Sequence, residues 1–221
     1  MQFWFVRADR LEKECKRMGL LTTLGMAMGS SWVSGINLYA AILTLGLLSR
    51  FGHHPLPGDL QILTNWWVIG VAGFMYCVEF IADKIPWVDS IWTGIHTFIR
   101  VPAGAVLAAA AFGKFDPAIQ IIAFMAGGGI ALSSHGTKTV TRAALNISPE
   151  PFTNIAASLS EDALVVGSIF MTVFLPGAII VVVSIALIAA FFIVPKTIKA
   201  IKSLYLKLFQ RPETSLPNTG R

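Results

Sequence analysis

The sequence predicts an all-α polytopic membrane protein with about six transmembrane or re-entrant helices. Hydrophobic residues make up 55% of the 221 positions and charged residues only 13%, whereas soluble domains carry about 25% charge. The mean hydropathy is +0.69, and the apolar runs are too long and too numerous for one soluble core. The clearest run, residues 178–194, has no charged residue and is almost long enough to cross a bilayer alone.

Basic residues flank the apolar region on both sides. Of the 17 Lys and Arg residues, five lie within the first 17 positions and six lie after Val194. Basic flanks mark the cytoplasmic side of a membrane. We expect a multi-pass protein of the bacterial inner (plasma) membrane, with both termini in the cytoplasm and therefore an even number of crossings. The net charge of +5 then reflects the membrane and not a nucleic-acid partner.

The first half of the chain predicts three membrane segments. Residues 20–48 are long for one span, and the small residues in their first half favour close helix packing or a local break. A loop follows at 53–59, which is rich in proline. Residues 61–82 form the next span, and the third combines an amphipathic stretch with the short apolar run 101–112. Residues 20–34 and 86–100 are each compatible with a span, a re-entrant segment or an interfacial helix.

The second half predicts three more crossings. Residues 118–145 form the fourth, with a break near Gly127–Gly129, residues 152–175 the fifth and residues 178–194 the sixth. The resulting domain plan places a cytoplasmic amphipathic segment at 1–19, a first membrane repeat at 20–113, a second at 114–195 and a basic cytoplasmic tail at 196–221.

The two halves align weakly with each other. Residues 34–37 align with residues 135–138, and each half begins with a helix rich in small residues. Three crossings per half would give the halves opposite orientations, and this predicts an inverted 3+3 repeat with broken helices, as in many secondary transporters. The alternative is a chance match, because helices rich in small residues align easily.

Ionisable side chains recur at helical spacing inside the apolar segments. His135, Lys138 and Arg142 stand at i, i+3 and i+7, so they share one helix face, and Glu161 and Asp162 lie on the next expected helix. A charged side chain at membrane depth costs about 2.5–3.5 kcal/mol by insertion scales. A set of them therefore needs a structural or functional reason.

These patterns assign two sets of candidate site residues. The residues expected to bind substrate are Arg100, His135, Lys138, Arg142, Asn146 and Asn154. The residues expected to couple protons or cations are Glu79, Asp83, Asp89, His96, Glu161 and Asp162. Facing basic and acidic stripes, with histidines and small-residue breaks, are typical of a water-filled cavity that binds an anion or an anionic head group.

Three classes of function are compatible with these residues. The first is a small transporter or flippase-like permease for an anionic solute or lipid head group, coupled to protons or cations. The second is a non-transporting scaffold whose charges pair internally. The third is a membrane-embedded hydrolase using His96 or His135 beside a carboxylate, although the chain has no G-x-S-x-G or H-E-x-x-H motif.

The transporter is the leading hypothesis, and with it we expect no enzyme activity, cofactor or metal. The expected partners are the lipid bilayer and the anionic solute or head group, with no nucleic acid. Self-association into a homo-oligomer is a further expectation.

Three polar stretches of the chain are long and distinctive. They are GINLYAAILTLGLLSRFG (35–52), EFIADKIPWVDSIWTGIHTFIRVPAGA (79–105) and SHGTKTVTRAALNISPEPFTNIAASLSED (134–162). On these residues the chain resembles a family of bacterial membrane proteins known as domain of unknown function 4126. The resemblance covers most of the chain between Leu20 and Val194. It implies that the polar stretches are the recognisable signature of the family, and it brings no activity with it.

Overall fold

The structure, a computed structural model, describes residues 2–145 and 151–209, which form helices joined by short connections. The elements are α1 (Gln2–Gly52), the 3-10 helix η1 (Gly58–Thr64), α2 (Trp66–Ala82), α3 (Pro86–Ala111), α4 (Pro117–Leu145), α5 (Pro151–Phe174) and α6 (Pro176–Phe209). Five helices are long and apolar enough to cross a membrane, or six if η1 and α2, bent by 70°, count as one span. The predicted all-α membrane class is confirmed.

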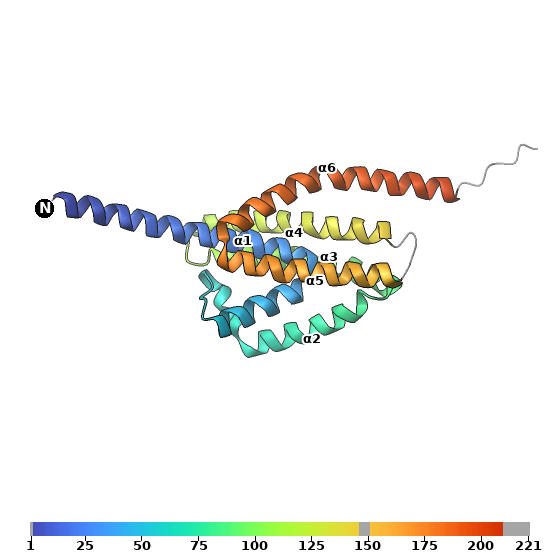
Figure 1. The fold of residues 1–221 in the computed structure, drawn as a ribbon, viewed down its shortest axis with the longest axis horizontal. Helices are drawn as coiled ribbons and strands as arrows, with labels where there is room; N and C mark the ends of the chain where they lie inside the picture. The colour runs from blue at the N-terminus through green and yellow to red at the C-terminus, as the bar shows by residue number, and fades with distance from the viewer. Residues whose placement is uncertain (1, 146–150, 210–221) are drawn as a thin grey trace, which may run out of the picture.

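Helix α1 consists of two arms joined by a sharp turn. Asn37 has non-helical backbone angles (φ −148°, ψ 97°) inside the helical run. Both arms reach the same level of α5, because a Cβ at Gly29 would meet Thr172 and the ring of His54 lies 4.7 Å from that of Phe174. A straight helix would separate Gly29 from His54 by about 37 Å. The chain therefore turns back at Asn37, and α1 is a helical hairpin (Figure 1).

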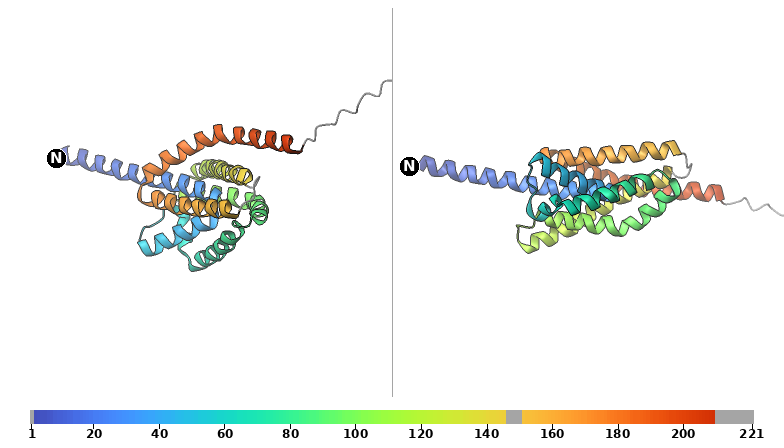
Figure 2. Two further views of the ribbon diagram at one scale, coloured as in Figure 1. Left: turned by 45° about the vertical axis from the view of Figure 1, so that its right-hand side comes forward. Right: turned by 90° about the horizontal axis from the view of Figure 1, so that it is seen from below.

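The other helices alternate in direction around this hairpin. Helices α3 and α4 are antiparallel, since Gly127 meets Ala108 while Gly104 meets Ala131. The connections that follow α1, α3 and α5 lie at one end of the bundle, which we call the first end. The connection between α2 and α3 lies at the other, second end, beside the end of α4. Helix α6 lies on the outside of the bundle next to α4 (Figure 2).

The hairpin also affects where the described ends of the chain lie. Five or six segments are long and apolar enough to span a membrane, and the first of them, α1, turns back at Asn37. The N-terminal arm of α1 projects from the first end, whereas α6 finishes at the second end (Figure 1). The even number of crossings and the cytoplasmic position of both termini stay predictions.

The structure bears on two other expectations about helix breaks. Helix α4 runs without interruption through Gly127–Gly129, so the predicted break there is wrong, and Gly127 instead allows close contact with α3. The inverted repeat is not confirmed, because α1 turns back at Asn37 whereas the aligned part of α4 continues as one helix.

Small residues let the first arm of the hairpin approach its neighbours closely. The hydroxyl groups of Ser31 and Ser34 donate to the carbonyls of Gly104 (2.8 Å) and Arg100 (2.9 Å) on α3. These serines are fully buried. Small residues and hydroxyl hydrogen bonds are the usual means of helix association in a bilayer, where the hydrophobic effect between helices is lost. The hairpin is thus packed as the centre of the bundle.

We predict that Gly35→Ala destabilises the protein, whereas Gly136→Ala does not. A Cβ at Gly35 would collide with the side chain of Ser134 and the carbonyl of Ala131, while nothing lies within 4 Å of a Cβ at Gly136. Overpacking of this kind costs about 1–3 kcal/mol, and alanine in an open helical position gains up to about 1 kcal/mol over glycine. Thermal unfolding in detergent measures both. Equal melting temperatures for the two variants would contradict the close packing of the hairpin.

Candidate functional site

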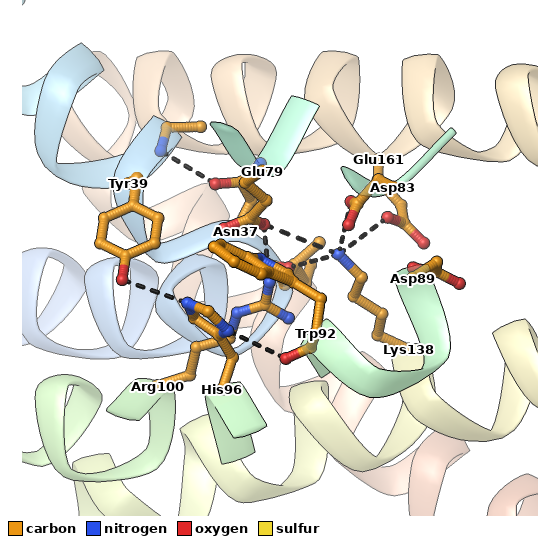
Figure 3. A network of polar contacts seen from close by, with 12 residues as sticks. Asn37, Tyr39, Glu79, Asp83, Asp89, Trp92, His96, Arg100, Lys138 and Glu161 are labelled. Carbon is orange, nitrogen blue, oxygen red and sulfur yellow. Dashed lines mark hydrogen bonds and ion pairs between the residues drawn. The ribbon is translucent and has the colours of Figure 1, made fainter. Parts of the chain in front are cut away.

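The turn at Asn37 lies beside a buried group of charged side chains (Figure 3). The side-chain oxygen of Asn37 accepts from the backbone N–H of Ala40 (2.9 Å) and so caps the second arm of the hairpin. Its amide nitrogen donates to the carboxylate of Asp162 (3.1 Å) on α5. Asn37 therefore holds the tip of the hairpin against the next helix. We call the surrounding charged residues the charge cluster: Glu79, Asp83, Asp89, Arg100, Lys138, Arg142, Glu161 and Asp162.

Lys138 lies at the centre of the charge cluster. Its side chain is 2% exposed, and the ammonium group donates to Asp83 (3.0 Å) and pairs with Glu161 (3.1 Å). Glu79 is slightly farther away, at 3.8 Å. The ammonium also donates to the backbone carbonyl of Ile36 (3.1 Å), at the end of the first arm of the hairpin. Lys138 thus connects α4 with the hairpin tip, α2 and α5.

Arg142 forms the second junction of the cluster, one helical turn further along α4. Its guanidinium binds Glu161 through two hydrogen bonds of 2.9 and 2.8 Å, the bidentate geometry that makes such pairs strong and directional. It also donates to the side chain of Asn154 (3.2 Å) and to the carbonyl of Asp83 (3.3 Å). Arg142 therefore ties the ends of α2, α4 and α5 together.

Arg100 and Glu79 form the most deeply buried pair. Both side chains are 0% exposed, and one guanidinium N–H of Arg100 donates to Glu79 at 2.6 Å. The Nε and Nη1 atoms of Arg100 and the Oε2 atom of Glu79 have no hydrogen-bond partner. Unpaired buried polar atoms are costly and are normally satisfied by ordered water or a ligand.

Asp89 is the least satisfied carboxylate of the cluster. It is fully buried, and neither of its oxygens has a hydrogen-bond partner. The nearest cation in contact is Arg142, at 4.0 Å. The indole N–H of Trp92, one turn further along α3, is also unpartnered. This side of α3 thus presents both acceptors and a donor that protein groups leave unused.

The two buried histidines lie apart from the carboxylates. His96 donates through Nδ1 to the carbonyl of Trp92 (2.9 Å), and its Nε2 lies 3.2 Å from the hydroxyl of Tyr39. His135 donates through Nδ1 to the carbonyl of Gly35 (3.2 Å), and its Nε2 lies 2.7 Å from the hydroxyl of Thr97. A ring nitrogen that faces a carbonyl must carry the hydrogen. Within residues 2–145 and 151–209, neither histidine pairs with a carboxylate as a hydrolase would require.

The structure brings together most of the residues singled out from the sequence. Eight of the twelve are joined by hydrogen bonds and ion pairs into one polar network, namely Glu79, Asp83, Asp89, Arg100, Lys138, Arg142, Asn154 and Glu161. Asp162, which binds Asn37, lies beside this network with His96 and His135, and Asn146 lies outside the described residues. The basic residues expected to bind substrate thus form ion pairs with carboxylates that were expected to couple ions.

Sequence reasoning missed the roles of Asn37, Tyr39 and Thr97. It also missed the backbone carbonyls of Gly35 and Ile36, which the turn releases from helical hydrogen bonding. The available signal was Asn37 itself, an amide side chain in the middle of an otherwise apolar and small-residue segment. Asparagine commonly bonds to nearby backbone and favours turns and caps over helix interiors.

We predict that Arg142→Met lowers the free energy of unfolding by about 3–5 kcal/mol, the usual cost of removing one partner of a buried ion pair. The variant would leave Glu161 and Asp83 without their guanidinium. The matched control is Lys114→Met, because Lys114 is exposed in the connection between α3 and α4, where substitutions change stability by less than about 0.5 kcal/mol. Detergent unfolding curves in which both variants behave alike would contradict the network.

Comparison with known proteins identifies the family of the chain. A family model described as domain of unknown function 4126 (DUF4126) matches residues 24–196. No curated protein and no solved structure matches the chain. The matched range contains the hairpin turn and every residue of the charge cluster. The chain belongs to the family described as domain of unknown function 4126, as the resemblance of its polar stretches implies.

Proposed function

We propose that this protein is an ion-coupled membrane transporter whose working site is the charge cluster at the tip of the hairpin. The main observation behind this proposal is that a broken helix presents free backbone groups to buried ionisable side chains. Half-helix ends that meet charged groups inside the membrane are the usual construction of secondary-transporter sites. The five or six long apolar helices support the membrane setting.

The balance of charge in the cluster supports ion coupling. Five carboxyl groups (Glu79, Asp83, Asp89, Glu161 and Asp162) meet three cationic groups (Arg100, Lys138 and Arg142), an excess of two carboxyl groups. Lys84, at the edge of the cluster, donates to the carbonyl of Phe80 instead of a carboxylate. An excess of negative charge in an apolar surrounding is strongly unfavourable. It favours the uptake of protons or cations.

The contacts also divide the roles among the basic residues. The side-chain N–H groups of Lys138 and Arg142 donate to carboxylates and to a backbone carbonyl. Two guanidinium nitrogens of Arg100, Nε and Nη1, have no hydrogen-bond partner. We therefore assign contact with an anionic solute or head group to Arg100, and ion coupling to the carboxylates around Lys138 and Arg142. A bacterial inner-membrane location remains part of this proposal.

A structural scaffold is the second candidate. It is favoured by one observation, that each cationic residue of the cluster lies within 4.0 Å of at least one carboxylate. Complete pairing, however, would leave few unsatisfied atoms. The unpartnered oxygens of Glu79, Asp83 and Asp89 are better explained by a site that exchanges water, ions or solute.

We predict solute-dependent, ion-coupled currents from the purified protein in proteoliposomes. On a solid-supported membrane, alkali chlorides, inorganic phosphate, glycerol phosphate and small carboxylates are applied in turn under an imposed pH gradient. At least one of them should evoke a current that changes with the gradient. Glu161→Gln should abolish this current, because it removes a carboxylate that contacts both Lys138 and Arg142.

The matched control is Asp116→Asn, which alters an exposed carboxylate that caps the start of α4 and should leave the current unchanged, since asparagine caps equally well. If folded wild-type protein gives no current with any of these solutes, the scaffold is the better account. Equal currents from Glu161→Gln and wild type would remove the cluster from the transport mechanism.

A further inference from the structure

The ammonium group of Lys138 is surrounded by an oxygen cage contributed by three other helical segments. The cage consists of the carbonyl of Ile36 at 3.1 Å, Asp83 at 3.0 Å, Glu161 at 3.1 Å and Glu79 at 3.8 Å. Carboxylate and carbonyl oxygens are the ligands that hard cations prefer in proteins. Lys138, entering from α4, thus occupies a position with the chemistry of a cation site (Figure 3).

The charge of the cage fits one monovalent cation. Its three carboxylates carry three negative charges, of which Arg100 balances one by its bond to Glu79 and Arg142 another by its bonds to Glu161. One negative charge is left, and the Lys138 ammonium matches it. Asp162 instead binds Asn37, and Asp89 faces Arg142 at 4.0 Å.

Two carboxylates of the cage have oxygen atoms that are available to bind a ligand. The second oxygens of Glu79 and Asp83 are buried and have no hydrogen-bond partner. The carbonyl of Ile36 faces Lys138 because the helix breaks at Asn37. The end of a half-helix carries partial negative charge from its unpaired carbonyls and so attracts cations. These are two independent reasons, beyond acidity, to expect a ligand here.

We propose that the cage is a binding site for one monovalent inorganic cation, and that the Lys138 ammonium is its built-in competitor. This deepens the proposed function, on which it rests: exchange between the tethered ammonium and a free cation is the ion-coupling step. Within residues 2–145 and 151–209 no group of three or more His, Cys, Asp or Glu side chains is placed to hold a metal ion on its own, and the Lys138 ammonium lies between the carboxylates of the cage.

The test replaces the tethered charge and measures cation binding in detergent. Lys138→Met keeps an apolar stem but leaves the cage with one uncompensated negative charge. The melting temperature of this variant should rise by several degrees, and saturate, as NaCl, KCl or NH₄Cl is added, because a ligand that binds only the folded state stabilises it. Choline chloride at the same ionic strength should not raise the melting temperature. Wild-type protein should need salt concentrations at least about tenfold higher, since Lys138 competes for the site.

Two controls make the result specific. Lys84→Met removes a lysine that bonds to the carbonyl of Phe80, and it should show the wild-type response to salt. The double variant Lys138→Met/Glu161→Gln restores the charge balance without a cation, and it should be folded in choline chloride with no cation-specific stabilisation.

Two outcomes would overturn the proposal. One is a Lys138→Met protein that responds to the alkali and ammonium salts no more than Lys84→Met does. The other is a Lys138→Met chain that remains unfolded in every salt while the double variant folds, because then charge balance is needed but a free cation cannot supply it. Since binding is measured without transport, failure of this site and failure of the transporter proposal are distinguished.

Discussion

A broken helix inside a membrane must find partners for the backbone groups that it frees, and this constraint governs the centre of the molecule. In water the carbonyls of Gly35 and Ile36 would be solvated at little cost, but an unsatisfied backbone group in hydrocarbon costs several kcal/mol. The protein supplies His135 to the first carbonyl and Lys138 to the second. The turn at Asn37 and the polar face of α4 therefore require each other.

The same constraint brings the charge cluster together. A lysine that satisfies the hairpin tip introduces a buried positive charge, which in turn needs carboxylates from α2 and α5. Among the carboxylates around Lys138, Glu79 pairs with Arg100 and Glu161 pairs with Arg142. Every partner comes from a different part of the chain, so the cluster fixes how the helices are arranged. It also concentrates more acid than base, and this excess is the physical basis for ion coupling.

The sequence predicts the membrane class, and its helical spacing singles out residues that the structure brings close together. It does not predict the hairpin, because a run of apolar and small residues such as 20–48 has nearly the same composition whether it crosses once or enters and returns. Spacing also places Lys138 and Arg142 on one face of α4 without naming their partners. Those partners lie 55 and 19 residues away (Asp83 and Glu161, respectively), and only the tertiary fold brings them together. Arg100, Lys138 and Arg142, which were expected to contact substrate, are therefore found in ion pairs.

The return of the chain at Asn37 is the central claim, and a distance across the hairpin tests it most directly. Spin labels at Leu20 and Phe51, both exposed, in a chain whose two native cysteines are replaced by serine, allow this distance to be measured by pulsed electron paramagnetic resonance. A straight helix would separate the two positions by about 46 Å. The hairpin predicts a distribution centred below about half of that length. A distribution centred near the straight-helix value would contradict the helical hairpin and the site built on its tip.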